Sequence, residues 1–337
     1  MKITLTCNIR PKEASEQFVE WDEPSTIHTI SRCLSSMGHQ VRILDCHGID
    51  IEREIRRDRP DLVFNIAEGL SGETRESLVP EILERLKIPY TGSGPQTLSH
   101  CLNKAKSKQI LRENGIWTPD WITSRDVLEN LPASLDFPVI VKPLYEGSSR
   151  GIMNHSVVFN SKELSLQTRR LLDELDEPVI VEQFLSGREF TVALLEDALT
   201  IEVLPIVEID FSSLPDTAHP IYGYEAKWIW DTETRPLRIF KCPARLTPAL
   251  KNDIRKTARE AFSALECKDW ARIDLRLDDC GRVHVIELNP LPGIIPDPRA
   301  NSCFPKAARA AGYTSCDLLR RVIDSAMFSV EIEKAAG

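Results

Sequence analysis

The sequence lacks several features that would place it in a broad class of protein. No apolar run approaches the roughly 20 residues needed to span a bilayer, and the opening residues, MKITLTCNIRPKE, contain no signal-peptide core. We therefore expect no membrane segment and no export, and a cytoplasmic protein. The nine cysteines form no CxxC pair and show no regular spacing. This favours reduced thiols over a disulfide framework or a zinc site.

The sequence also has fewer basic than acidic residues. The chain has 42 Lys and Arg against 51 Asp and Glu, a net charge of −9. This balance argues against nucleic acid as the main partner, while a local basic site for a nucleotide remains compatible with it. At 337 residues with 42% hydrophobic content, the chain is expected to fold into two or three globular domains.

Two familiar nucleotide-binding fingerprints are incomplete. Gly92 and Gly94 lack the third glycine and the ribose acid of a dinucleotide site, which argues against an oxidoreductase. The loop EGSSRG, residues 146–151, has no GK[ST] and precedes a predicted strand, so it is not a P-loop. Its backbone N–H groups and hydroxyls could still cradle phosphate oxygens, although such a loop is more often a simple turn.

Hydrophobic periodicity predicts an α/β first domain. The elements expected there are strand 2–6, helix 26–37, strand 41–44, helix 51–56, strand 62–66 and helix 78–86. This βαβ rhythm indicates a parallel sheet. The polar loop that follows strand 62–66 carries Glu68 and Arg75. We interpret it as functional, because loops after buried strands often are, with a local Glu68–Arg75 ion pair as the alternative.

The rest of the chain alternates strands and helices with one long connection. We expect helices 97–114, 248–265, 304–311 and 315–328, strands 138–142, 152–159, 178–182, 190–195 and 201–209, and a frayed end at 331–337. Lys104, Lys106 and Lys108 on the first helix are typical of a solvated face. The connection 210–241 is long and rich in aromatic residues, which favours a functional lid over disorder.

A two-stranded hairpin is predicted over residues 270–289. Apolar and polar residues alternate on both sides of a turn at Cys280–Gly281. That turn would place Arg272 opposite Asn289, Asp274 opposite Glu287 and Asp278 opposite Val283. Facing carboxylates repel unless a cation lies between them, and such oxygens are ligands that Mg²⁺ takes beside phosphates. The alternative is a half-exposed hairpin with a charged outer face.

Several motifs in a fixed order resemble one family. They are VIVKP with EGSSRG, VEQFLSGREF, YEAKW, CPA, WARIDLRLD and IELNPLPG. Together they resemble the ATP-grasp superfamily and, within it, the D-alanine:D-alanine ligase-like enzymes. The resemblance implies a three-domain ATP-grasp architecture of α/β class, with α+β topology in the nucleotide-binding part. It divides the chain into 1–95 (substrate domain), 96–186 (central domain) and 187–330 (catalytic domain, lid at 210–241), and relatives with this architecture are often dimers.

The resemblance also implies roles for individual residues. ATP would be bound by Lys104, Lys142, Glu146, Ser148, Ser149, Glu182, Leu185, Glu189 and Lys227. Magnesium, or manganese in its place, would be bound by Asp274, Glu287 and Asn289. The reaction would depend on Arg272, Lys227, Ser148 and Glu23. Amino-acid-like substrates would meet Glu23, Glu68, Trp228, Gly293 and Arg299.

The chemistry implied is ATP-dependent amide-bond formation. A carboxylate attacks the γ-phosphate of ATP to give an acyl phosphate, and an amine then expels the phosphate. Metal ions and cationic side chains stabilise the charge on the transferring group. No enzyme nucleophile is needed, so the absence of a Ser-His-Asp constellation is consistent with this reaction.

The chain departs from the family pattern at the amino-acid pockets. Asn8-Ile9-Arg10-Pro11 replaces a glycine-rich start, Glu68 replaces a histidine, and Trp228 replaces a lid tyrosine. Pro298 and Arg299 replace a serine and a leucine. These changes suggest altered substrates. We expect Arg299 to pair with an acceptor carboxylate, and Glu23 and Glu68 to bind an ammonium group.

Three functions therefore remain open. The leading interpretation is a carboxylate–amine ligase with altered substrates. The second is D-alanine:D-alanine ligation itself. The third is a nucleotide-binding regulator that has lost catalysis, which the retained lysine, arginine and acidic residues argue against.

Overall fold

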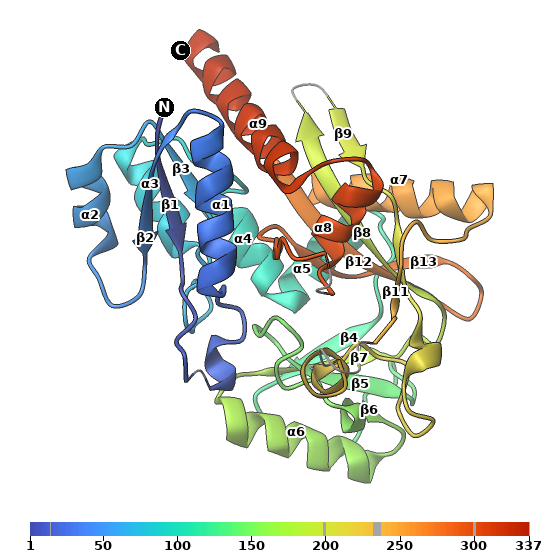
Figure 1. Ribbon diagram of the computed structural model, residues 1–337. Helices are drawn as coiled ribbons and strands as arrows, with labels where there is room; N and C mark the ends of the chain where they lie inside the picture. The colour runs from blue at the N-terminus through green and yellow to red at the C-terminus, as the bar shows by residue number, and fades with distance from the viewer. Residues whose placement is uncertain (14, 198–199, 232–236, 299–300, 337) are drawn as a thin grey trace.

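The computed structural model describes residues 1–13, 15–197, 200–231, 237–298 and 301–336, with side chains described as far as residue 332. Within these residues the chain forms three β-sheets flanked by helices. Figure 1 shows the N-terminal part at the left, the central part below and the C-terminal part at the right. None of the described helices has the length and apolar character needed to cross a bilayer.

The N-terminal part is the predicted α/β layer. Strands β1 (Lys2–Cys7), β2 (Gln40–Asp45) and β3 (Leu62–Asn65) form a parallel sheet in the order β2-β1-β3. The helices are α1 (Pro24–Ser36), α2 (Ile51–Asp58) and α3 (Leu78–Leu86). Helix α1 begins before residue 26, where it was expected, because Pro24 occupies the first turn, where its missing N–H costs nothing. The prediction of a parallel βαβ sheet is confirmed.

The central part is an antiparallel sheet. Its strands β4 (Trp121–Ser124), β5 (Val139–Pro143), β6 (Val157–Val158) and β7 (Val179–Gln183) lie in the order β4-β7-β5-β6. Helix α6 (Ser161–Leu175) covers it. Strand β4 and helix α6 were not predicted. The expected strand 152–159 is wrong for most of its length, because Asn154–Ser156 forms a 3₁₀ turn and only β6 pairs.

The helix expected over 97–114 is two helices. They are α4 (Pro95–Leu102) and α5 (Lys104–Glu113), and Asn103 separates them in an extended conformation. Its side chain accepts a hydrogen bond from the backbone N–H of Lys106 at 3.0 Å. This is the N-cap geometry that begins a new helix.

The C-terminal part carries the largest sheet. Strands β8 (Glu189–Asp197), β9 (Thr200–Val203), β10 (Val207–Ile209), β11 (Phe240–Lys241), β12 (Trp270–Leu277) and β13 (Val283–Asn289) form it. Its order is β11-β10-β8-β12-β13, with β9 paired to β8. The expected single strand 201–209 is broken between β9 and β10, where Pro205 has no N–H to donate.

Three helices flank this sheet: α7 (Pro248–Ala264), α8 (Cys303–Ala310) and α9 (Ser315–Ala336). The prediction of a frayed end at 331–337 is wrong for the residues described, since α9 continues to Ala336.

The hairpin register was predicted correctly at the end that carries Arg272 and Asp274. Arg272 lies opposite Asn289 and Asp274 opposite Glu287. Beyond Asp274 the register shifts by one residue, so that Leu277 rather than Asp278 pairs with Val283. The extra residue is Ile286, and its carbonyl accepts a hydrogen bond from Lys108 Nζ at 3.2 Å. A β-bulge thus re-aims the strand next to the cavity described below.

The N-terminal and C-terminal parts share one hydrophobic core. Trp270 at the start of β12 is fully buried, with its ring centroid 5.9 Å from that of Phe64 on β3 and 5.8 Å from that of Phe304 on α8. Residues of β1, α1, β8 and α9 complete this core. The shared core fixes the N-terminal parallel sheet against the hairpin of β12 and β13. The domain boundaries at about 95 and 186 stay predictions.

One expectation about the cysteines is wrong. Cys33 on α1 and Cys316 on α9 form a disulfide, with their Cα atoms 5.1 Å apart, while the other seven cysteines are free thiols. The two helices lie side by side in Figure 1. Sequence spacing could not reveal this pair, because 283 positions separate its members.

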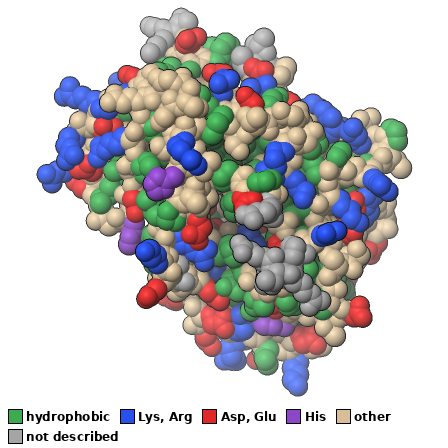
Figure 2. All heavy atoms as spheres, in the orientation of Figure 1, with side chains coloured by type: hydrophobic (Ala, Val, Ile, Leu, Met, Phe, Trp, Pro, Cys, Tyr) green, Lys and Arg blue, Asp and Glu red, His purple; other side chains and the backbone are tan. Residues whose placement is uncertain are grey.

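On the face shown in Figure 2, acidic and basic side chains are intermixed. This face has no broad basic surface of the kind that binds nucleic acid.

Candidate active site

A cavity of about 600 Å³ is lined by residues from all three parts of the chain. It contains every predicted site residue that the structure describes. These are Glu23, Glu68, Lys104, Lys142, Glu146, Ser148, Ser149, Glu182, Leu185, Glu189, Lys227, Trp228, Arg272, Asp274, Glu287, Asn289 and Gly293. Arg299 lies outside the described residues. The structure thus brings together residues that are up to 270 positions apart in the sequence, from Glu23 to Gly293.

The hairpin supplies the acidic wall of the cavity. Asp274 receives two hydrogen bonds from Arg272, Nε to Oδ1 at 3.2 Å and Nη2 to Oδ2 at 2.9 Å. Glu287, opposite Asp274, lies 3.6 Å from Lys104 Nζ. Burial opposes ionisation of Glu287, but Lys104, Arg272 and Lys142 outweigh it and lower its pKa. The charged form of Glu287, which binds cations, is therefore favoured.

The hairpin oxygens suit a hard divalent cation that takes its remaining ligands from a phosphate. Asp274 and Glu287 contribute carboxylates, and Asn289 contributes an amide oxygen that also accepts from the Leu291 N–H at 2.8 Å. Among the described residues no group of three or more His, Cys, Asp or Glu forms a complete metal cage. A set of this size fits magnesium, which keeps water and substrate phosphates among its ligands, better than a closed structural metal site.

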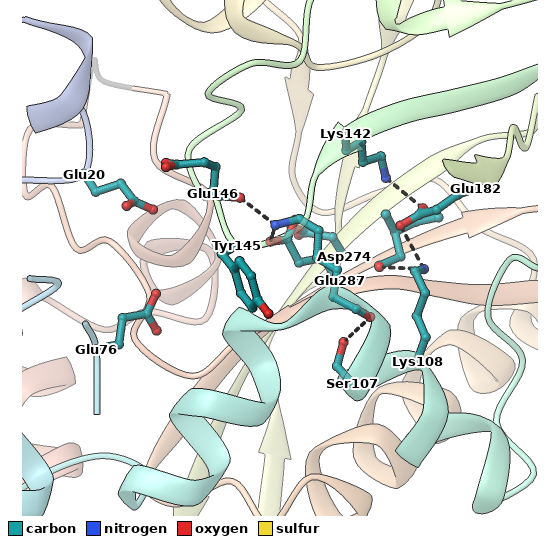
Figure 3. Close-up of polar contacts among 12 residues, drawn as sticks. Glu20, Glu76, Ser107, Lys108, Lys142, Tyr145, Glu146, Glu182, Asp274 and Glu287 are labelled. Carbon is teal, nitrogen blue, oxygen red and sulfur yellow. Dashed lines mark hydrogen bonds and ion pairs between the residues drawn. The ribbon is translucent and has the colours of Figure 1, made fainter. Parts of the chain in front are cut away.

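A buried ion network begins at the cavity wall with Lys142 and Glu182 and continues inward to Lys108 (Figure 3). Glu182 on β7 lies between Lys142 Nζ at 2.8 Å and Lys108 Nζ at 3.4 Å. Lys108 also donates to Thr118 Oγ1 at 3.0 Å. Burial opposes the charge of Glu182, but the lysines outweigh it and lower its pKa.

Lys108 corrects the expectation of a solvated lysine face. Its side chain has no exposed surface, and burial lowers its pKa to about 8 despite the attraction of Glu182. Lys104 is likewise buried, whereas Lys106 makes an exposed contact with Gln109. The (i, i+4) spacing of Lys104 and Lys108 would have placed both on one helix face, and that spacing was the signal available in the sequence.

The glycine-serine loop forms a strained turn over the cavity. Ser148 and Ser149 have φ values of 50° and 64°, in the left-handed region that non-glycine residues seldom adopt. Ser149 Oγ donates to the Tyr222 carbonyl at 2.9 Å, and Trp228 Nε1 donates to the Ser148 carbonyl at 3.3 Å. Such strain persists only where neighbouring groups hold it, and it is concentrated at functional sites.

The described part of connection 210–241 contains the hydrogen-bond partners of this loop, Tyr222 and Trp228. It includes a π-helical turn at Glu225–Ile229, which carries Lys227 and Trp228. Turns of this type occur frequently at functional sites. Burial and the nearby Arg272 lower the pKa of Lys227 to about 8. Cys303, which sequence reasoning did not single out, lies beside these two cations, and burial raises the pKa of its thiol to about 12.

The N-terminal end of the cavity is acidic. Burial, with repulsion from Glu76 and Glu20, raises the pKa of Glu68 well above its ordinary value. Glu23 is more exposed and lies 3.5 Å from Arg10, whose guanidinium is 5.7 Å from the Trp228 ring centroid. Glu20 and Glu76 were not predicted as site residues, although Glu76 belongs to the same polar loop as Glu68.

The alternative drawn from the sequence was a local ion pair between Glu68 and Arg75, and the ion pairs of Arg75 in the structure are different. Its described partners are Glu20 at 2.6 Å and Glu76 at 3.6 Å, in place of Glu68.

Removing the amine of Lys108 should destabilise the protein. In Lys108→Met, Glu182 stays buried but loses one of its two cations. We expect a loss of roughly 3 kcal/mol in the free energy of unfolding, measured with urea at pH 7. Lys106→Met, on the same helix, should change it by less than about 0.5 kcal/mol. Equal stability of Lys108→Met and the wild type would contradict a buried, charged Lys108.

Comparison with known proteins agrees with this geometry. Residues 110–324 match the family described as D-ala D-ala ligase C-terminus. The chain is 31% identical to the uncharacterized protein y4sG of Sinorhizobium fredii, over 97% of each chain. It is 34% identical to the D-alanine–D-alanine ligase of Bordetella petrii, over 89% of this chain and 86% of that protein.

A solved structure is similar over its whole length. The D-alanine–D-alanine ligase of Bacillus anthracis complexed with ATP matches with a TM-score of 0.74 and 25% identity, covering 100% of both chains. The family match covers more than half of this sequence, and curated ligases resemble most of it. The chain therefore belongs to the D-alanine–D-alanine ligase family of ATP-grasp proteins.

Proposed function

We propose that this protein is an ATP-dependent ligase that joins the carboxylate of one amino-acid-like substrate to the amine of another through an acyl phosphate. One observation carries the proposal. A single cavity places Lys104, Lys142, Lys227 and Arg272 against the facing carboxylates Asp274 and Glu287. Cations at this density, beside hard oxygen ligands, suit a transferring phosphoryl group.

The nucleotide would occupy the part of the cavity between the central sheet and the hairpin. Lys104 and Lys142 would bind its phosphates beneath the loop of Glu146, Ser148 and Ser149. Glu182, Leu185 and Glu189 would bind adenine and ribose, and Lys227 would reach the γ-phosphate from the lid. The Bacillus anthracis ligase, which was crystallised with ATP, supports this assignment by its similarity.

The hairpin residues would hold the divalent ion. Asp274, Glu287 and Asn289 have the oxygen ligands that Mg²⁺ prefers, and Mn²⁺ would be accepted in its place. Such an ion, when bound, neutralises charge on the phosphoryl group during transfer. The guanidinium of Arg272, fixed in orientation by Asp274, would stabilise the negative charge that develops on the reacting carboxyl. Trp228 and the rest of the lid would exclude water, which would otherwise hydrolyse the acyl phosphate.

The substrates would differ from two molecules of D-alanine. Glu23 and Glu68 would bind an ammonium group, Gly293 would line the acceptor side, and Arg299, outside the described residues, would pair with an acceptor carboxylate. The support is that Arg10, Glu68 and Trp228, which depart from the family pattern, line the cavity. D-alanine–D-alanine ligation itself is the second candidate, because curated relatives with over 30% identity carry that name. The need for ATP supports a cytoplasmic reaction.

Phosphate release from Mg-ATP tests the proposal. D- and L-amino acids are supplied singly and in pairs, and products are identified by mass spectrometry. We expect release only with a competent pair, together with an amide product. Arg272→Met should lower kcat about 10²-fold or more, because it removes a charge that acts on the transition state. A protein that binds Mg-ATP but releases no phosphate with any pair would be a regulator.

The pH dependence tests the role of Lys227. Its pKa, about 8, lies below the ordinary lysine value, so its positive charge is present below pH 8 and is lost as the pH rises through 8. We expect kcat/KM for ATP to fall over that range, because this parameter reports ionisation in the free enzyme. Lys227→Arg should keep its charge and move the fall to higher pH. A wild-type profile that stays flat to pH 9.5 would exclude Lys227 as the titrating group.

A further inference from the structure

Arg75 joins the N-terminal part of the chain to the loop over the cavity. Its side chain is 4% exposed. Nη2 lies 2.6 Å from Glu20 and 3.6 Å from Glu76, and Nη1 donates to the carbonyl of Tyr145 at 2.9 Å. Tyr145 opens the glycine-serine loop that follows β5. In Figure 3, Glu20 and Glu76 lie to the left of Tyr145 and Glu146, and both glutamates line the cavity.

The backbone of this loop is held from three directions. Arg75 donates to the carbonyl of Tyr145, Lys104 Nζ to that of Glu146 at 2.5 Å, and Trp228 Nε1 to that of Ser148. These donors come from the N-terminal part, helix α5 and the lid. The loop has internal turn hydrogen bonds, such as that from the Arg150 N–H to the Gly147 carbonyl at 2.9 Å, but these three donors tie it to the rest of the molecule. Its position depends on groups that are distant in the sequence, and two of them carry positive charge.

Gly147 provides a second point of contact with the same ion pair. A Cβ atom at this position would lie 1.9 Å from Glu20 Oε1. The carboxylate that Arg75 holds is therefore packed against the loop backbone, and only glycine leaves room for it. Glu20 and Glu76 line the cavity, whereas Arg75 is not among the described lining residues. Arg75 thus contacts the loop without lining the cavity, through the Tyr145 carbonyl and through Glu20.

We propose that Arg75 is a positioning residue that holds the loop from Tyr145 to Ser149 in place over the nucleotide phosphates, so that nucleotide affinity depends on the N-terminal part of the chain. The inference rests on the proposed nucleotide site. Without the guanidinium, Glu20 and Glu76 would face each other without their shared cation, and the Tyr145 carbonyl would lose a charged donor. Both changes release the loop.

Equilibrium binding of Mg-ADP to the full-length protein tests this role without turnover. We expect Arg75→Met to raise the Kd about tenfold or more, the effect of losing a charge-assisted hydrogen bond. Arg75→Lys should raise it less, because an ammonium can reach Glu20 or the carbonyl but lacks the planar fork that binds both. The matched control is Arg85→Met, which breaks the exposed Arg85–Glu52 pair in the same part of the chain and should leave the Kd unchanged.

Affinity and folding are separated by measuring binding stoichiometry and the unfolding midpoint in parallel. A merely structural role would lower the stoichiometry or the midpoint and leave the Kd of the folded fraction unchanged, which would overturn the proposal. If Arg75→Met fails to fold, the Kd of Arg75→Lys for Mg-ADP decides instead. A Kd within twofold of the wild-type value would then contradict the proposal. Failure of the wild type to bind Mg-ADP would instead reject the nucleotide site itself.

A double-mutant cycle adds an independent readout. Gly147→Ala should displace Glu20 and raise the Kd through the same contact. If Arg75 acts through that contact, the combined variant should raise the Kd by clearly less than the product of the single effects. Full multiplicativity of the two effects would show that Arg75 and Gly147 act separately, and would contradict the mechanism.

Discussion

The balance of charge in the central cavity constrains the rest of this molecule. Asp274 and Glu287 face each other across the hairpin, where Asp274 pairs with Arg272, and Lys104, Arg272 and Lys142 lower the pKa of Glu287. Glu182 forms ion pairs with both Lys142 and Lys108. Buried charges of this kind are tolerated only when each has a partner at close range. The surrounding elements must therefore be placed accurately, since a shift of one residue in the hairpin would turn its acidic side chains to the other face.

The fold meets this requirement through shared packing. Trp270, at the first position of β12, packs between Phe64 of the N-terminal sheet and Phe304 of α8. The hairpin is thus anchored to both neighbours at the end from which Arg272 and Asp274 project. The Ile286 bulge adjusts the partner strand and directs a carbonyl to Lys108. Apolar packing fixes the frame, and the ion pairs then set the side chains within it.

The structural features that the sequence could predict depend on patterns between residues close together in the chain. The pairing of Asp274 with Glu287 followed from alternation and one turn, and the parallel N-terminal sheet followed from its βαβ rhythm. The bulge at Ile286 was not predictable, because its carbonyl is bonded to a lysine 178 positions away. The partners of Arg75 were not predicted for the same reason, since Glu20 and Tyr145 are 55 and 70 positions from it. Lys108 appeared solvated because periodicity alone does not say what covers a helix face. The roles of the substrate-binding residues stay predictions, because they rest on departures from a family pattern.

The central claim is that a substrate carboxylate is activated by phosphoryl transfer in this cavity. The most direct measurement uses a carboxylate substrate labelled with ¹⁸O in both oxygens and follows the label by mass spectrometry. Attack on the γ-phosphate of ATP, followed by displacement by the amine, leaves one labelled oxygen in the released phosphate and one in the amide. We predict that result for the competent pair found by phosphate release. Phosphate that carries no label from the carboxylate would contradict the account, because its fourth oxygen would then have come from water.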